Sequence, residues 1–510
     1  MLSPAPTEAA TEARPTGASG PLGIDAGTWA LAAITGLAAV LRFATLSSQS
    51  YWLDEAQAVH ELHLSFGAML TAWSRYEWNP PLYLLVAWPW AKLFGTGELA
   101  LRSLSALLGV ALIPLVYLCC RELVSRPAGL MAAAFAAVNP FMIWYSQEAR
   151  EYMLLVVLCA GSLLFFARAW RTGGRGDLIW WAALSILALL TQYYASFLVA
   201  PEGLALVYRY RSRITVLALG ALGVVELALI PHVVPRLDRP VQFIVSLPLS
   251  LRLQQVPVTF AMNTLYKSSL VSYGLIGAAV VGVAAIGLLI AGAGRQELRG
   301  AGLAAALAGA VILVPLALAL AGHDAYIARG LMPGWVPLAI VLAAACTARG
   351  ARTAGAVLAV ALLALFVYAG IRIQSDPSFQ KTPDWRAVAA ALGPRPPTQR
   401  AIVVYDGVFG SAQLSLYLDG VPWSGPGLKP TPAPVTVSEV DVVGNVAQRL
   451  GPLPGGIRVI SSRTVGGSRI VRFGLARPWT LTPEAIGTRA PTLLGPSAGG
   501  AVVMVQRPAA

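Results

Sequence analysis

Runs of about twenty apolar residues with almost no charge limit the possible fold of this chain more than any other feature. One such run, LIGAAVVGVAAIGLLIAGAG, extends from Leu275 to Gly294. A helix of this length and composition crosses the hydrocarbon core of a bilayer. The 510 residues are 56% hydrophobic and 12% charged, whereas about a quarter of the residues in an average soluble protein are charged. The sequence therefore predicts a polytopic membrane protein.

The basic residues between the apolar segments predict how the chain is oriented. The piece from Asn79 to Gly95 is short and holds three prolines, so we expect it to be re-entrant or interfacial. If it does not cross, five arginine-bearing loops share one side, which the positive-inside rule makes cytoplasmic. If it does cross, all five move to the side of Asp54. We adopt the first arrangement, with the amino terminus inside and Asp54 outside. The eleven predicted spans are 27–46, 98–120, 129–145, 151–170, 178–194, 195–210, 214–231, 271–292, 301–320, 331–347 and 354–373.

Composition divides the chain into three parts. Residues 1–24 are rich in Pro, Ala, Thr and Gly, which predicts a disordered cytoplasmic segment without a cleavable signal. Residues 25–373 form the predicted membrane domain, and 374–510 a soluble α/β accessory domain outside the membrane. The fold class is thus an all-α polytopic membrane bundle of about eleven spans plus interfacial helices, with a small α/β carboxy-terminal domain. In the tail we expect helices at 384–393, 411–418 and 440–451, and strands at 401–407, 457–463, 469–476 and 501–508.

Two acidic motifs lie where the chain leaves predicted spans on the outer side. In YWLDEAQAVHELH, residues 51–63, Asp54 and Glu55 begin a predicted amphipathic helix in the headgroup layer. Its expected apolar stripe is Leu62, Phe66, Met69, Leu70 and Trp73. In WYSQEAREYML, residues 144–154, Glu148 and Arg150 fall in a very short connection, and charges at this depth usually line an aqueous cavity. The alternatives are that Asp54 only caps its helix, and that Glu148 and Arg150 form an internal pair in a snorkelling turn.

Four motifs together resemble a known family. YWLDEA, NPPLYLL, WYSQEAREYMLL and TQYYASFLVA follow one another over residues 27–210 in an order and spacing similar to those of the C-type membrane glycosyltransferases. KTPDWRAVAAAL, from Lys381, resembles the start of the soluble tail in bacterial relatives. The family's first-loop aspartate falls on Asp54 and its second-loop acid on Glu148. Relatives often have His where this chain has Asn79, and Arg-Tyr where it has Arg329-Gly330.

The resemblance implies an enzyme that moves a sugar from a polyprenyl-phosphate donor to a hydroxyl of a lipid, glycan or protein acceptor. Such a hydroxyl needs a base, which we assign to Asp54, and direct displacement predicts inversion at the anomeric carbon. Glu148 and Glu55 complete the predicted catalytic group. Cations are needed at the departing phosphate. The candidates for the donor phosphate are Arg150, Lys267 and Arg329, and those for acceptor or sugar contacts are Asn79, Tyr83, Tyr152 and Tyr193. An interfacial aromatic belt is the alternative for the tyrosines, and headgroup contact for the cations.

The sequence offers two alternative sites for a metal ion and predicts which partners the protein binds. Mg²⁺ or Mn²⁺ held by Asp54 and Glu148 is one prediction, and a site with His60 and His63, three residues apart, is a weaker one. No other cofactor is expected. Expected partners are the donor, the acceptor and membrane lipids of the plasma (inner) membrane, and no nucleic acid, because the basic residues behind the net charge of +13 lie in loops between spans. The alternative functions are a lipid or sugar transporter or flippase with a charged outer cavity, and a non-catalytic scaffold.

Overall fold

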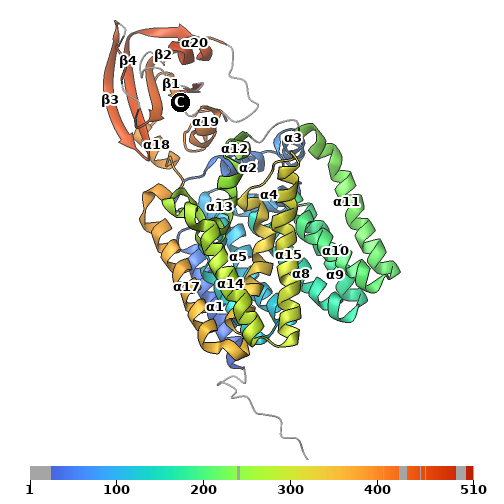
Figure 1. Cartoon of the computed structure of the whole chain (residues 1–510). Helices are drawn as coiled ribbons and strands as arrows, with labels where there is room; N and C mark the ends of the chain where they lie inside the picture. The colour runs from blue at the N-terminus through green and yellow to red at the C-terminus, as the bar shows by residue number, and fades with distance from the viewer. Residues whose placement is uncertain are drawn as a thin grey trace, which may run out of the picture.

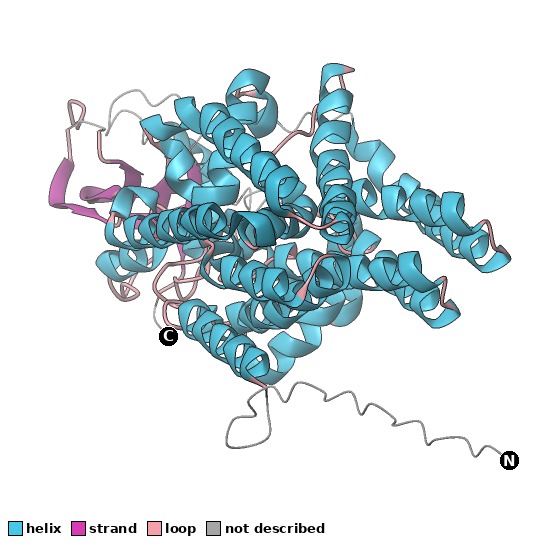
Figure 2. Ribbon diagram, turned by 60° about the horizontal axis from the view of Figure 1, so that its bottom comes forward, coloured by secondary structure: helices cyan, strands magenta, loops and turns pink. Residues whose placement is uncertain are grey.

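The structure is a computed structural model in which a helical bundle carries a small region of strands and helices at one end (Figure 1). It describes residues 25–237, 242–405, 407–423, 433–447, 450–453, 455–489 and 501–508. The predicted disordered segment 1–24 lies outside the described residues. Figure 2 shows that the strands are confined to one side of the molecule and that the rest is helical.

The membrane part is built from helices in the order that the apolar segments predict. The α-helices are α1 (Ala26–Phe43), α2 (Leu53–His63), α3 (Phe66–Tyr76), α4 (Leu82–Phe94), α5 (Glu98–Leu123), α6 (Arg126–Val138), α7 (Pro140–Ser146), α8 (Tyr152–Thr172), α9 (Arg175–Leu189), α10 (Ser196–Tyr210), α11 (Arg213–Leu237), α12 (Gln242–Val245), α13 (Leu249–Met262), α14 (Gly274–Gly292), α15 (Arg295–Leu320), α16 (Trp335–Cys346) and α17 (Arg352–Ser375). Short 3-10 helices are η1 (Tyr193–Ala195), η2 (Asn263–Lys267), η3 (Ser269–Tyr273), η4 (Ala328–Gly334), η5 (Arg349–Ala351) and η6 (Pro377–Phe379).

The all-α bundle is confirmed, and all eleven predicted spans coincide with helices, but fewer than eleven are long enough to cross. In the described part of the chain eight helices have the length and composition of a span, and nine if α6 and α7, bent by 59° at Asn139, count as one. The predicted spans 178–194 and 195–210 became α9 and α10 of 15 residues each, about 22 Å at 1.5 Å per residue. They are shorter because η1 and the residues Thr191 and Gln192 turn the chain between them.

The basic loops lie together at one end of the bundle, as the orientation argument requires. The end opposite to them carries α2, α3 and the carboxy-terminal region (Figure 1). Contacts between the loops connect one to the next: Asp25–Arg126 at 2.9 Å, Glu122–Arg171 at 3.1 Å, the Tyr210 hydroxyl to the Trp170 carbonyl at 2.7 Å, Gly300 against the Leu123 carbonyl, and Gly292 against Gly350. The prediction that these loops share one side of the membrane therefore agrees with the fold.

Helix α4 does not cross the bundle, in agreement with the expectation for its proline-rich sequence. At its start the Leu82 N–H donates to the Leu190 carbonyl, and near its end Lys92 Nζ donates to the Leu62 carbonyl at 3.1 Å. Leu62 belongs to α2, and Leu190 follows α9 at the end away from the basic loop at Arg175, so both ends of α4 stay at the end of the bundle that carries α2.

The amphipathic helix expected from Asp54 to Trp73 is wrong in one respect, because it is two helices. The chain turns extended at Leu64, where α2 ends, and α3 begins at Phe66. Lys92 and the Trp88 indole bind carbonyls at this break, which lets α2 end there. The expected stripe is interrupted accordingly: Leu62 is fully buried, whereas Phe66 is 45% exposed.

The carboxy-terminal region is an α/β unit, as predicted. Its elements are α18 (Trp385–Leu392), β1 (Arg400–Val404), α19 (Gly407–Ser415), β2 (Val435–Asn445), β3 (Ile457–Val465), β4 (Ser468–Leu481), α20 (Pro483–Arg489) and β5 (Val502–Gln506). The strand order is β3-β4-β2-β1-β5, with β1 parallel to β2 and the other neighbours antiparallel. Trp385 of α18 packs on one face of the sheet and Ile486 of α20 on the other, so helices cover both faces.

One prediction for this region is wrong. Residues 440–451 were expected to be helical, but residues 435–445 form β2, the central strand of the sheet. The physical reason is the run of β-branched residues, which suits a strand buried on both faces. Val440 and Val442 pack on the side of α20, and Val443 packs on the side of α18.

The carboxy-terminal region docks on the outer end of the bundle through the start of α18 and the residues in and just after α19. Arg386 forms an ion pair with Glu98 at 2.9 Å, and the Tyr417 hydroxyl donates to the same carboxylate at 2.5 Å. The Trp385 N–H donates to Ser50 Oγ at 3.1 Å. Helix α19 also packs against α2, so this region covers the end of the bundle where the acidic motifs lie.

Candidate active site

Asp54 and Arg329 meet at the outer end of the bundle. Asp54 is in the first turn of α2, and its Oδ2 lies 3.5 Å from a terminal guanidinium nitrogen of Arg329. The two side chains are 27% and 23% exposed, so solvent reaches both. The Arg329 guanidinium also lies over the Trp52 ring, 5.8 Å from its centroid. A carboxylate and a guanidinium that are open to water thus stand side by side.

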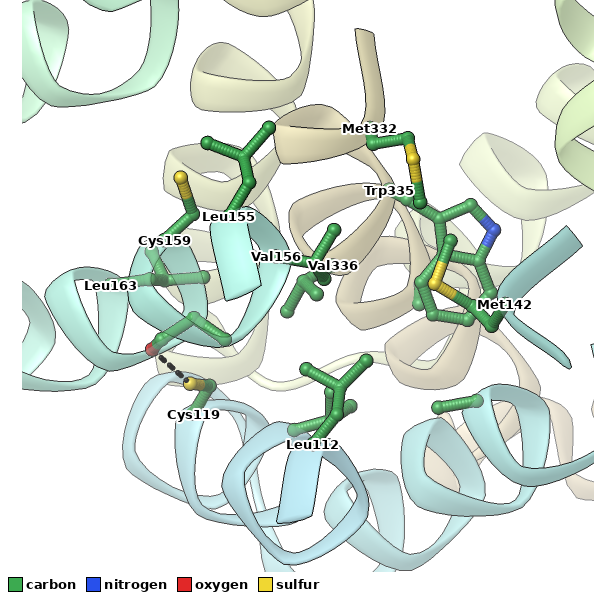
Figure 3. Close-up of a cluster of buried hydrophobic side chains, with 14 of the residues drawn as sticks. Leu112, Cys119, Met142, Leu155, Val156, Cys159, Leu163, Met332, Trp335 and Val336 are labelled. Carbon is green, nitrogen blue, oxygen red and sulfur yellow. Dashed lines mark hydrogen bonds between the residues drawn. The ribbon is translucent and has the colours of Figure 1, made fainter. Parts of the chain in front are cut away.

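The position of Arg329 follows from the packing of the segment that carries it. In η4, Met332 is fully buried, and at the start of α16 Trp335 is 4% exposed. Figure 3 shows both among the buried side chains of α5, α7 and α8. Before η4, Arg252 of α13 binds Asp324 at 2.5 Å and the Tyr326 carbonyl at 2.8 Å. The segment is therefore held on both sides of Arg329.

Glu55, the neighbour of Asp54, is fully buried and serves as an internal anchor. Its carboxylate binds Arg102 through two hydrogen bonds of 2.8 and 2.7 Å and accepts the Ala149 N–H at 2.9 Å. Burial alone would raise the pKa of Glu55, but Arg102 and Lys381 outweigh burial and hold that pKa well below its ordinary value. Glu55 therefore ties the start of α2 to the connection between α7 and α8, although its side chain is closed to a substrate.

Glu148 is buried beside this anchor. Its Oε1 accepts the Trp144 indole N–H at 2.8 Å and lies 3.2 Å from Lys381 Nζ. Its Oε2 is buried and has no hydrogen-bond partner among the described residues. Burial raises the pKa of Glu148, Lys381 opposes the rise, and the charges of Glu55 and Asp54 add to it. Asp54 and Glu148 are thus within electrostatic reach of each other, at one end of the bundle.

Arg150 is enclosed by protein groups instead of being open to a phosphate. It is 6% exposed and forms ion pairs with Glu77 at 3.3 Å and Glu151 at 2.9 Å. It also donates to the backbone carbonyl of Asp54 at 3.3 Å. Asn79, expected to contact an acceptor, gives its amide N–H to Glu151 at 2.8 Å. Arg150 therefore holds the backbone of Asp54 in place, and Asn79 contributes indirectly, because it binds Glu151, a partner of Arg150.

The remaining predicted contact residues differ in how deeply they are buried. Lys267 is exposed at the end of η2, and burial raises the pKa of its neighbour Tyr266 while the charge of Arg329 opposes the rise, which places η2 within electrostatic reach of Arg329. Tyr83 is 3% exposed, and its hydroxyl has no hydrogen-bond partner among the described residues. Tyr152 is buried edge-on against Tyr145, with ring centroids 4.6 Å apart. Tyr193 is half-buried in η1, between α9 and α10.

The structure explains why this chain has Gly330 at the position where relatives often have tyrosine. A Cβ on Gly330 would lie 2.4 Å from the ring of Tyr194, so a tyrosine cannot be placed there without moving that ring. The Tyr194 hydroxyl donates to the Ala325 carbonyl, in the segment before Arg329. A tyrosine from η1 thus packs beside Arg329 in this chain.

The two carboxylates predicted to hold a divalent metal ion each lie beside a cation of the chain. Lys381 and Arg329 stand at the carboxylates of Glu148 and Asp54, where a metal would need to bind, and a second cation there would be repelled. His60 stacks on Trp423 at 4.3 Å, and burial and then His63 lower its pKa to about 4. In the parts of the chain that the structure describes, no group of three or more His, Cys, Asp or Glu side chains could hold a metal.

Three residues of the site were missed by the sequence interpretation: Trp52, Arg102 and Lys381. Trp52 belongs to the first acidic motif without a role predicted for it, and Arg102 falls within the predicted span 98–120. Lys381 had a signal, because it begins the quoted motif KTPDW and is one of only four lysines in an arginine-rich chain. Its meaning could not be read from the sequence, because the contact with Glu55 joins residues 326 positions apart.

A polytopic helical bundle with an acid–arginine site at one end and an α/β tail agrees with the resemblance to the integral-membrane glycosyltransferases of C type. The chain resembles ArnT from Cupriavidus metallidurans bound to undecaprenyl phosphate, with 14% identity, a TM-score of 0.52, and coverage of 88% of this chain and 98% of ArnT. The apo structure of the same ArnT gives 14% identity, a TM-score of 0.50, and coverage of 89% and 99%.

The sequence comparison supports the same class. The family model of dolichyl-phosphate-mannose-protein mannosyltransferases matches residues 78–234. A comparison with curated proteins found no match. The family match over residues 78–234 and the fold shared with ArnT both agree with the resemblance to the C-type membrane glycosyltransferases seen in the sequence motifs.

Proposed function

We propose that the protein transfers a sugar from a polyprenyl-phosphate donor to a hydroxyl acceptor at the end of the bundle that carries Asp54. The observation that carries this proposal is the partly exposed pair of Asp54 and Arg329, set among acids that are buried. The similar ArnT structure contains undecaprenyl phosphate, and the matching family is named for a dolichyl-phosphate sugar. Both names support a lipid-linked phosphate as the donor group.

Asp54 acts as the base in the proposed reaction. As the acceptor oxygen forms a bond to the anomeric carbon, its proton moves to a carboxylate oxygen of Asp54. The bond between that carbon and the phosphate oxygen breaks, and the phosphate leaves with the electron pair. Direct displacement of this kind inverts the configuration at the anomeric carbon. Positive charge that develops on the sugar is stabilised by the nearby carboxylates.

Arg329 stabilises the negative charge of the leaving phosphate. Its guanidinium lies 3.5 Å from Asp54 and is 23% exposed, so a phosphate that enters beside Asp54 can bind it. Lys267, exposed at the end of η2, supplies a second cation at the mouth of the pocket. Arg150 keeps the backbone of Asp54 in place from behind and does not bind the phosphate.

Glu148 orients the acceptor in this proposal. Its Oε1 is occupied by Trp144 and Lys381, whereas Oε2 is left for a hydroxyl donor. Tyr83, whose hydroxyl is buried, is a second candidate for a polar contact with the acceptor or sugar. No step of the proposed reaction passes through a metal ion.

The orientation proposed for the protein follows from its arginine-rich loops. If they face the cytoplasm, the pocket opens on the outer face of the plasma membrane, where a lipid-linked sugar can enter it from the bilayer. The carboxy-terminal region, docked on α2, would then cover the pocket from the outside.

The experiment that tests this function supplies purified protein in vesicles with a panel of radiolabelled polyprenyl-phosphate sugars and candidate hydroxyl acceptors. The proposal predicts that for at least one donor the label leaves the lipid and appears in the acceptor. A transporter would move the intact labelled lipid or sugar across the bilayer without cleaving the phosphate bond. Retention of configuration in the product would contradict direct displacement.

A further inference from the structure

We propose that Lys381, delivered by the carboxy-terminal region, is the positioning cation of the active site and makes that region part of the catalytic unit. This inference rests on the proposed function. Lys381 follows the last span, and its ammonium reaches 3.3 Å from Glu55 Oε2 and 3.2 Å from Glu148 Oε1. One lysine therefore bridges the carboxylates of the two acidic motifs.

The bundle provides a ready-made site for this ammonium. The rings of Trp52 and Trp144 lie 5.6 and 5.4 Å from Lys381 Nζ, and aromatic faces at such distances attract cations. With Glu55 and Glu148 these rings form a cage of two carboxylates and two indoles, and the lysine side chain in it is 11% exposed. All four cage residues come from the first and second acidic motifs, and the cation comes from the tail.

The docking of the tail fixes the lysine in the cage. The Lys381 N–H donates to Gln49 Oε1 at 2.8 Å. A few residues later, Trp385 binds Ser50 and Arg386 binds Glu98. These contacts anchor both the backbone of Lys381 and the helix that follows it, α18, to the bundle.

Two residues of the cage, Trp52 and Glu148, connect Lys381 to the groups that we assign to donor and acceptor. Trp52 lies between the two cations, since its ring is also 5.8 Å from Arg329, which in turn contacts Asp54. Glu148 binds Lys381 through Oε1, and we assign its buried Oε2, which has no partner among the described residues, to the acceptor hydroxyl. Without the ammonium, Glu148 would be a buried carboxylate with only one hydrogen bond, and its orientation toward the acceptor would be lost. The lysine thus acts through Glu148.

The experiment compares Lys381→Met and Lys381→Arg with the control Arg372→Met in the full-length protein. Arg372 lies near the same junction, is 44% exposed, and pairs only with Asp376 among the described residues. We expect Lys381→Met to lower kcat by roughly tenfold to a hundredfold with a smaller change in the KM for the donor. Lys381→Arg keeps the charge and should restore part of the rate, and Arg372→Met should transfer like the wild type.

A double-mutant cycle with Glu148→Gln separates positioning from mere anchoring of the tail. If Lys381 acts through Glu148, adding Lys381→Met to Glu148→Gln should lower kcat by less than about threefold further. The same cycle measured by Tm should show coupling between the two residues, whether or not sugar is transferred.

Three results would overturn the inference. Lys381→Met could transfer at the wild-type rate while the wild type is active, in which case the proposed function stands and the role of Lys381 falls. The kcat losses of the two substitutions could multiply fully, or the Tm cycle could show no coupling, either of which would leave the lysine as a simple anchor. A wild type that cleaves no donor would remove the proposed function, and the role of Lys381 with it.

Discussion

Replacing Glu55 by glutamine removes one negative charge from the most enclosed ion pair of the site. The same replacement of charge at its neighbour Asp54 should have a much smaller effect on stability. Glu55 is 0% exposed and Arg102 is 2% exposed, and two short hydrogen bonds join them. In Glu55→Gln the guanidinium remains buried without its counter-ion, which destabilises a protein by about 3–5 kcal/mol. Asp54 is 27% exposed with one contact of 3.5 Å, so Asp54→Asn should change stability by less than about 1 kcal/mol.

Thermal unfolding of both variants in the same detergent, followed by tryptophan fluorescence, measures this contrast. From about 2–4 °C per kcal/mol in domains of 150–250 residues, Glu55→Gln should lower Tm by roughly 6–20 °C, and Asp54→Asn by less than about 4 °C. Activity should respond in the opposite order, because of these two residues only Asp54 touches the substrate in the proposed reaction. Equal Tm values for the two variants, or a lower Tm for Asp54→Asn, would refute the assignment of Glu55 as the anchor.

Three further predictions follow from other contacts. Burial and then the charge of Glu77 raise the pKa of Glu61 to about 8, so the folded protein holds a proton that the unfolded chain releases above about 4.5; stability should fall as pH rises from about 4.5 to 8, and Glu61→Gln should remove that fall in Tm measured across this range. Arg329→Gln should lower kcat/KM for the donor by roughly a hundredfold without changing Tm by more than a few degrees, because a charge-assisted phosphate contact is lost from a partly exposed site; an unchanged rate would show that another cation receives the phosphate. Glu98→Gln should loosen the carboxy-terminal region, since both the Arg386 ion pair and a Tyr417 hydrogen bond end on this carboxylate; limited proteolysis between α17 and α18 should become faster, and equal cleavage rates would argue against this docking contact.

Much of the fold could be predicted because its cause is local in the sequence. Apolar runs and arginines between them identified the helices of the bundle and their common end, since both signals come from the bilayer itself. The proline content of the piece from Asn79 was enough to predict that α4 does not cross. The break of the first outer helix at Leu64 was missed, because it depends on Lys92 and Trp88 binding carbonyls from another helix.

The tail shows the same limit in another form. The segment 440–451 was assigned to a helix, but its central place in the sheet is decided by partners on both sides, which periodicity within one segment does not reveal. The other predicted strands, at 401–407, 457–463, 469–476 and 501–508, overlap β1, β3, β4 and β5.

The sequence was enough to identify the acids of the candidate site, but not to predict the separate role of each. Asp54, Glu55 and Glu148 were identified by motif and position, and the structure brings them to one end of the bundle. Which of two adjacent carboxylates is open and which is buried depends on Arg102, 47 residues later in the chain. The bridging role of Lys381 depends on how the tail docks, which no local pattern in the sequence encodes.

The most direct test of the central claim is the initial rate of sugar transfer by Asp54→Asn in vesicles supplied with an active labelled donor. Asp25→Asn is the matched control, because Asp25 is also an ion-paired aspartate but lies at the opposite end of the bundle. Loss of a general base slows such reactions by about 10²–10⁴-fold, so Asp54→Asn should retain at most a few per cent of the rate while Asp25→Asn transfers normally. Transfer by Asp54→Asn at the rate of the wild type would contradict the account.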